Sequence, residues 1–257
     1  VGSGQSGGQI AKDLSDAGRE VYLATGRVGR LPRRYRGRDL ALWLTENGAL
    51  DVRRSEFMLP SGTVPARPLQ GAMETLSLQG LSAQGVILLG RMTGADGTRL
   101  TFSDDVADNI RFADEASAAV RARVDDYIAR KSIAAPPAED DPAEVVAPKL
   151  PSPPITSLDL ADRGINTVVW CTGFDGDFSW LKVPGALTSD GQPAHVDGFG
   201  AAVGVYFPGL DFAVTRKSGT ILAAGEEADA IVADIRRRMD WPAASSLRRD
   251  RGGAISP

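Results

Sequence analysis

Six residues at the start of the chain have the spacing of a phosphate-binding turn, Gly-x-Gly-x-x-Gly. They are Gly2-Ser3-Gly4-Gln5-Ser6-Gly7. In this pattern the first glycine permits a tight turn, the second lets the backbone approach a pyrophosphate, and the third allows close packing of a helix on a strand. A helix predicted over residues 7–17 would present free N–H groups and positive potential to the phosphates. We therefore predict a dinucleotide cofactor held by Gly2, Gly4, Gln5, Ser6 and Gly7, the alternative being a packing turn without a ligand.

The end of the next predicted strand, residues 21–24, decides which dinucleotide would bind. A site for NAD places Asp or Glu there, to accept a hydrogen bond from the ribose 2′-hydroxyl. This chain has Thr25-Gly26-Arg27 instead, followed by a run of arginines that includes Arg30 and Arg33. A guanidinium pairs with a 2′-phosphate, which a carboxylate would repel. We predict NADPH rather than NADH, with Thr25 and Arg27 at the site and Arg30 or Arg33 as helpers. The alternative is a solvated, arginine-rich loop.

Other residues whose side chains could take part in a reaction give weaker signals. Tyr127 and Lys131 have the spacing of the short-chain dehydrogenase pair, but they end a predicted helix beside a linker. Cys171 is expected to be a small buried apolar residue. His195 is expected in a loop with a structural hydrogen bond. The sequence has no carboxylate pair with acid–base spacing and no cluster of metal ligands, so it indicates neither a catalytic residue nor a metal site.

Composition excludes several classes of protein. The chain has 257 residues, of which 42% are hydrophobic and 24% charged, as in globular proteins of one large or two small domains. Its formal net charge of -4 gives no general attraction to nucleic acid. The longest apolar runs are too short to span a bilayer, so we expect no membrane insertion and a cytoplasmic location. The motif follows Val1 at once, and we therefore expect a chain truncated at its N-terminus.

Helical and strand patterns alternate along the chain and predict an α/β fold. The helices are expected at 7–17, 38–47, 104–131 and 219–239, and the strands at 21–24, 86–92, 98–102, 167–171 and 203–207. Seven prolines within 132–156 indicate a linker or long excursion. We therefore expect a Rossmann-like NAD(P)H-binding domain over 1–131, a Pro-rich linker over 132–156 and a second domain over 157–257.

Several of these segments together resemble the NADPH domain of flavin-containing monooxygenase-like flavoproteins, most closely the bacterial branch associated with cation or potassium transport. The resemblance covers nearly all of the chain. It is carried by the glycine turn, by Thr25-Gly26-Arg27, and by Pro-Arg-Arg-Tyr-Arg-Gly-Arg-Asp at 32–39, Leu-Gly-Arg at 89–91, Phe-Ser-Asp-Asp at 102–105, Trp-Cys-Thr-Gly-Phe at 170–174, Gly-Val-Tyr-Phe-Pro-Gly-Leu at 204–210 and Arg-Lys-Ser-Gly at 216–219.

The resemblance implies FAD as a second cofactor, with residues 157–257 as the C-terminal part of an FAD-binding domain. It adds Thr172, Gly173, Gly209 and Ser218 as cofactor contacts. It further implies an enzyme that passes a hydride from NADPH to FAD, with a small-molecule substrate that the sequence does not identify.

The chain departs from the family because it carries a single glycine fingerprint, and the segment that marks monooxygenases is absent. The resemblance thus implies a monooxygenase-like oxidoreductase, while the residues of this chain do not by themselves indicate monooxygenation. Two alternatives stay open. One is a non-catalytic dinucleotide sensor linked to cation transport, and the other is an inactive fragment.

Overall fold

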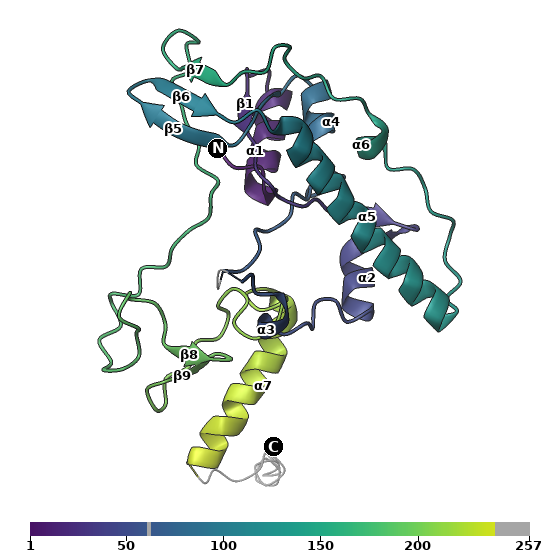
Figure 1. Cartoon of the computed structure of the whole chain (residues 1–257). Coiled ribbons are helices and arrows are strands. Elements are labelled where there is room, and N and C mark those ends of the chain that lie inside the picture. The colour runs from purple at the N-terminus through teal and green to yellow at the C-terminus, as the bar shows by residue number, and fades with distance from the viewer. Residues whose placement is uncertain (61–62, 240–257) are drawn as a thin grey trace, which may run out of the picture. The chain divides into compact units, whose positions relative to one another are not determined.

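The computed structural model describes residues 1–60 and 63–239, which form helices and small sheets in two compact units (Figure 1). The first unit is Val1–Gly48 with Pro65–Phe174, and the second is Ala49–Val64 with Asp175–Pro257. Residues 132–174 thus group with the first unit and residues 49–64 with the second. Residues 240–257 of the expected last domain lie outside the described residues.

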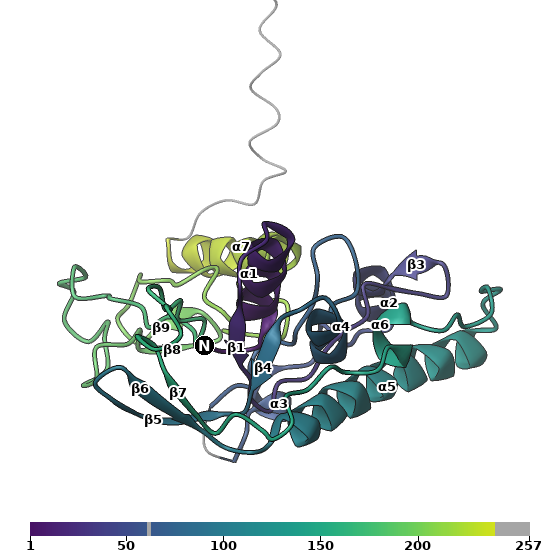
Figure 2. The same cartoon turned by 90° about the horizontal axis from the view of Figure 1, so that it is seen from above.

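The first unit contains a pair of short parallel strands, β1 (Tyr22–Ala24) and β4 (Ile87–Leu89), with Leu23 opposite Leu88. Helix α1 (Gln5–Asp16) and helix α4 (Leu78–Ala83) lie beside this pair (Figure 2). The helices and strands share one apolar core, to which they contribute Ala11, Leu23, Leu78, Leu81 and Leu88. The predicted helix over 7–17 and the predicted strand over 21–24 are thus confirmed. The helix is marked by apolar residues at helical spacing, and the strand by a short apolar run that ends before Gly26.

The beginning of the chain adds an extended segment beside β1. The Val1 ammonium donates to the Val169 carbonyl (2.7 Å), and the Cys171 N–H donates to the Val1 carbonyl (2.8 Å). This is the bonding pattern of parallel strands. The Gly2 N–H donates to the Ala24 carbonyl (3.0 Å), so Val1 lies between β1 and residues 169–171. The strand predicted over 167–171 is not formed as a strand, because within the described part of the chain these residues pair only with Val1.

A second, antiparallel sheet has the order β5 (Met92–Asp96), β6 (Arg99–Phe102) and β7 (Ser157–Asp159). Its buried side chains Leu100, Phe102 and Leu158 form a core with Leu89. The strand predicted over 86–92 is split between β4 and β5. The split falls at Gly90, where a Cβ would stand 1.8 Å from the carbonyl oxygen of Ser103.

Helix α5 (Val106–Lys131) has 26 residues and confirms the predicted helix over 104–131. Its C-terminal half packs on a third core around Trp43 of α2 (Leu40–Glu46). Tyr35 joins this core from the hairpin of β2 (Arg34–Tyr35) and β3 (Arg38–Asp39). The expected linker over 132–156 contains a short helix, α6 (Pro142–Val145). Helix α6 contacts α4, so this part of the linker belongs to the packed unit.

The second unit consists of α3 (Arg54–Phe57), a hairpin of β8 (His195–Val196) and β9 (Phe199–Gly200), and helix α7 (Ile221–Arg238). Helix α7 confirms the predicted helix over 219–239. The strand predicted over 203–207 is wrong, because the chain turns at Gly204 (φ 79°) and only Tyr206 makes a bridge, to Phe199.

Candidate functional site

The glycine turn is built so that two of its positions admit no side chain. Gly2 has φ 102°, and a Cβ there would stand 2.5 Å from the carbonyl oxygen of Cys171. A Cβ on Gly7 would stand 1.8 Å from the carbonyl oxygen of Gly2. Contacts under 3.0 Å require the backbone to move, so both positions need glycine. The first glycine makes the turn and the third brings α1 against it, as the spacing predicts.

The N-terminus of α1 presents its backbone N–H groups without a side-chain cap. Gly4 is the N-cap residue and has no side chain to accept from them, and the first turn contains no acidic residue. Gln5 and Ser6 are exposed there. Uncapped N–H groups and the helix dipole together favour an anion. A Cβ on Gly4 would lie 3.1 Å from the Arg67 carbonyl oxygen, so only a small adjustment would admit one.

Thr25 follows β1 and is held from three directions. It is buried, and its N–H and hydroxyl both donate to the Leu89 carbonyl (2.9 and 2.8 Å). Its hydroxyl accepts from the side-chain amide of Asn109 on α5 (3.0 Å). The next residue, Gly26, donates its N–H to the Ser3 hydroxyl (3.1 Å). Thr25 therefore fixes the turn after β1 against the glycine turn, and its own polar atoms are already bonded within the protein.

Arg27 differs from the other arginines predicted at the site. Its side chain is exposed, and the guanidinium carbon lies 4.8 Å from the centre of the Phe112 ring. Across residues 1–60 and 63–239, no carboxylate forms an ion pair with it. Arg33, in contrast, pairs with Asp39 (2.5 Å) and is partly covered. Arg27 is thus the predicted arginine whose charge is still available to a ligand.

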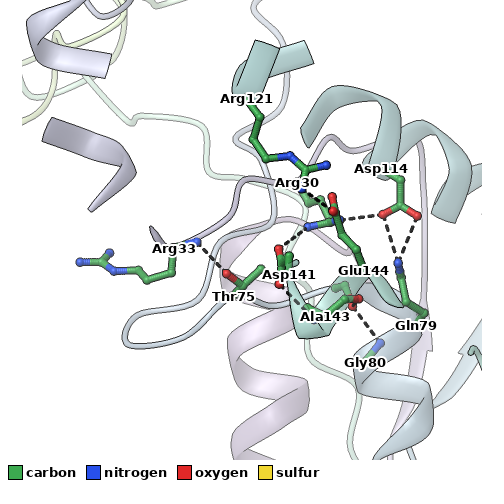
Figure 3. Close-up of polar contacts among 11 residues, drawn as sticks. Arg30, Arg33, Thr75, Gln79, Gly80, Asp114, Arg121, Asp141, Ala143 and Glu144 are labelled. Atoms are coloured by element: carbon green, nitrogen blue, oxygen red, sulfur yellow. Dashed lines mark hydrogen bonds and ion pairs between the residues drawn. The ribbon is translucent and has the colours of Figure 1, made fainter. Parts of the chain in front are cut away.

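Arg30 is fully buried and cannot be the helper that the sequence suggested. Its guanidinium is surrounded by Asp114 (2.7 Å), Asp141 (3.4 Å) and Glu144, as Figure 3 shows. The side chain of Arg121 also bonds to Glu144 (2.5 Å). Arg30 therefore joins α5 to the segment around α6, because a buried guanidinium needs carboxylates to compensate its lost hydration.

A cavity of about 200 Å³ lies beside the arginine-rich hairpin. Its arginines already have acceptors: Arg36 pairs with Asp125 (2.6 Å), and Arg34 donates to the Gly37 carbonyl (2.6 Å). Burial, followed by the hydrogen bond to Asp125, raises the pKa of the Tyr35 phenol above its usual value. Among the lining arginines, Arg33, Arg36 and Arg121 pair with carboxylates, whereas Arg34 is exposed and donates to a neutral carbonyl. It is lined by residues 32–37, 73–75, 121 and 139–142.

The four contacts that the resemblance adds lie in different units. Thr172 and Gly173 are exposed in the first unit, directly after Cys171. Gly209 and Ser218 belong to the second unit. The Ser218 hydroxyl is buried and accepts from the N–H groups of Val214 and Thr215 (both 3.0 Å), while the Gly209 N–H donates to Glu227 (3.1 Å). The hydrogen bonds of Gly209 and Ser218 are made within their own unit.

The weaker candidates, Tyr127, Cys171 and His195, make contacts that belong to the fold. Tyr127 packs against the core around Trp43, four residues before the exposed Lys131. Cys171 is a half-buried free thiol beside the glycine turn. His195 lies in β8 rather than in a loop, and its Nδ1 accepts from the Gly198 N–H (3.1 Å). Burial, more than the nearby charge of Arg54, lowers the pKa of His195.

Residues 1–60 and 63–239 contain no candidate metal site and no candidate membrane-spanning helix. No group of His, Cys, Asp and Glu side chains there could hold a metal ion. No helix there combines the length and the apolar character needed to cross a bilayer.

The sequence did not indicate Phe112 and Asn109, which contact Arg27 and Thr25. Both lie on α5, and Asn109 shares the buried face with Ala113, Ser117 and Val124. A polar amide side chain on the buried face of a helix is the signal that marks Asn109. Nothing in the sequence pairs either residue with a loop more than 80 positions away.

The chain is a distant homologue of proteins named as oxidoreductases. It is 26% identical over 236 residues, 91% of this chain, to "Uncharacterized oxidoreductase CzcO-like" of Geobacillus kaustophilus (strain HTA426). It is 34% identical over 74 residues, 29% of this chain, to "Uncharacterized oxidoreductase CzcO" of Bacillus velezensis and 32% identical over 74 residues to the protein of that name in Bacillus subtilis (strain 168). The matches cover 51% of the Geobacillus protein and 21% of each Bacillus protein, so the chain spans about half the length of the first relative. No family model and no solved structure matches it.

Proposed function

We propose that this chain is the NADPH-binding part of a flavin-dependent oxidoreductase, in which a hydride passes from NADPH to FAD. The observation that carries the proposal is the uncapped N-terminus of α1, behind a turn with two positions that admit only glycine. Arg27 supports it further, as an exposed arginine without a carboxylate partner among the described residues. The names of the homologues support an oxidoreductase, and the mixed α/β elements are compatible with a dinucleotide-binding fold.

The residues fit the two charged parts of NADPH. The N–H groups at the start of α1 would hold the pyrophosphate, since Gly4 leaves them uncapped and no acidic residue competes there. Arg27 would hold the 2′-phosphate, because its guanidinium is a charge-assisted donor at the end of β1. Thr25 would orient this turn through its bonds to Leu89 and Asn109. Bound NADPH supplies a hydride, and this chain binds and orients its phosphates.

The flavin part of the proposal rests on the resemblance alone. The hydroxyl of Ser218 and the N–H of Gly209 are used inside the second unit, and the chain carries one glycine fingerprint. These residues do not form a cradle for FAD by themselves, so we derive no step through it. We propose no substrate and no monooxygenation step for this chain.

The remaining parts of the proposal follow from the sequence. We propose residues 1–131 as the NADPH-binding domain, 132–156 as the linker and 157–257 as part of a flavin domain. We also propose a cytoplasmic protein that binds no nucleic acid, with a functional link to a cation transporter as in the branch it resembles.

The test is a binding measurement followed by a redox measurement on the same sample. We expect the chain to bind NADPH and not to oxidise it faster than free FAD does, because it carries one glycine fingerprint. Oxidation clearly above the rate of free FAD would show that the chain uses flavin itself, which the dinucleotide-sensor alternative does not allow. A folded chain that binds neither NADPH nor NADH would overturn the proposal.

A further inference from the structure

The loop after β1 is held along one face of α5 by a series of contacts. Thr25 accepts from Asn109 (3.0 Å), and Arg27 lies over Phe112 (4.8 Å to the ring centre). Further along, a Cβ on Gly29 would stand 2.9 Å from the Cβ of Ala116, so the loop backbone lies directly on the helix. Residues 109, 112 and 116 are one helical turn apart and share one face. The helix therefore fixes the loop on both sides of Arg27.

We propose that Phe112 is a specificity-determining residue, which holds the Arg27 guanidinium ready for a 2′-phosphate without neutralising it. This inference rests on the proposed function. An aromatic ring attracts a guanidinium through its electron-rich face. The ring brings no opposite charge, in contrast to a carboxylate. Arg27 can thus be restrained in position and still be attractive to an anion, and a side chain already restrained loses less conformational entropy when the ligand binds.

The neighbouring arginines show the other arrangement. Arg36 lies near the ring of Tyr35 (5.7 Å) but also pairs with Asp125. Arg38 lies over Trp43 (4.2 Å) and pairs with Glu46. In the run from Arg27 to Arg38, these two have a ring and a carboxylate together. Among the described residues, Arg27 has the ring contact and no carboxylate partner. Its contact with Phe112 therefore leaves the charge of Arg27 available to an anionic ligand.

The test compares two small probes that differ only in the phosphate of interest, adenosine 2′,5′-bisphosphate and 5′-AMP. Their dissociation constants are measured by calorimetry for the whole chain and its variants. For Phe112→Leu we expect a loss of about two- to fivefold in affinity for the bisphosphate, the range of an exposed cation–π contact, and no change for 5′-AMP. Phe112→Tyr keeps a ring and should keep the preference. Phe112→Glu adds a carboxylate beside Arg27 and should remove the preference.

A double variant distinguishes an effect of Phe112 through Arg27 from a general loss of binding. Arg27→Ala should lower bisphosphate affinity by about tenfold or more. Adding Phe112→Leu to Arg27→Ala should cause no further loss, because the ring acts through the arginine. Arg123→Ala is the matched control, since it removes one exposed positive charge from the same helix away from the loop. It should change neither probe.

Other results would contradict either the role of Phe112 or the proposed function itself. Equal losses for both probes in Phe112→Leu, or an unchanged preference in folded Phe112→Leu and Phe112→Glu, would overturn the role of Phe112 while leaving the proposed function in place. If Phe112→Leu does not fold, as judged by circular dichroism, Phe112→Tyr and Phe112→Glu decide. Absence of binding of both probes to the unmodified chain would instead show that the proposed function is wrong.

Discussion

Arg27 and Arg30 are three positions apart and have opposite surroundings. The first is exposed and lies over an aromatic ring, and the second is fully buried among carboxylates. The sequence indicated both as candidates, because both follow β1 in an arginine-rich run. It could not separate them, since the acidic partners of Arg30 come from positions 84 and 111 residues further along the chain. The local sequence thus indicates that an arginine follows β1. Which arginine can still bind a ligand depends on carboxylates that lie far along the chain.

Replacing Arg30 by methionine should lower the free energy of unfolding by about 3–5 kcal/mol. This is the usual range when one partner of a buried ion cluster is removed, because Asp114, Asp141 and Glu144 would lose their shared counter-charge. Urea unfolding followed by circular dichroism measures the change. Arg111→Ala, which breaks only exposed pairs with Asp108 and Glu115, is the control and should stay within about 0.5 kcal/mol of the unmodified chain. A similar small effect for Arg30→Met would contradict the buried cluster.

Among the elements, the long helices were predictable and some strands were not. Helices α1, α5 and α7 have apolar residues at helical spacing, and that signal is contained within each segment. The segments 167–171 and 203–207 have strand-like composition, but a strand also needs a neighbour with matching register. Val1 alone pairs with the first, and the turn at Gly204 ends pairing in the second. The helix at 142–145 was hidden because prolines surround it.

The N-terminus of α1 can be tested as an anion site with Gly4→Val. A branched side chain there would occupy the space in front of the first N–H groups, so NADPH affinity should fall about tenfold or more. Calorimetry gives the affinity, and circular dichroism must show an intact fold, because the Arg67 carbonyl has to shift slightly. Gly225→Ala is the control, since nothing lies within 4 Å of the added Cβ. A folded Gly4→Val variant with unchanged affinity would place the cofactor elsewhere.

Helix α7 contains an acid-sensitive contact. The pKa of Asp234 is lowered from 3.8 to about 2, first by Arg238 and then by the hydrogen bond from Tyr206 (2.7 Å). A lowered folded-state pKa stabilises the fold above pH 3.8, and this contribution disappears as the pH falls from about 4 towards 2. The unfolding free energy should therefore decrease over that interval, and less steeply in Asp234→Asn. Equal slopes for both proteins, measured by urea unfolding at several pH values, would show that the carboxylate is not paired in solution.

At the scale of the whole molecule, the chain has two units and a single glycine fingerprint, and it spans about half of its first relative. We expect the purified chain to be colourless or nearly so, because it carries one glycine fingerprint, whereas the resemblance calls for a separate one for FAD. The second unit exposes Trp180, Val203 and Ile221, so a tendency to aggregate is also expected. The absorption spectrum of the purified chain checks this expectation. Yellow protein with FAD close to one-to-one would contradict it and would move the flavin to the glycine turn.

The most direct test of the central claim is a calorimetric titration of the whole chain with NADPH and with NADH, repeated on Arg27→Ala. We expect the unmodified chain to bind NADPH more tightly than NADH. In the variant, NADPH affinity should fall by about 1–3 kcal/mol, the contribution of a charge-assisted contact, and NADH affinity should barely change. An equal loss for both cofactors, or no preference for NADPH in the unmodified chain, would contradict the claim that Arg27 binds a 2′-phosphate beside the glycine turn.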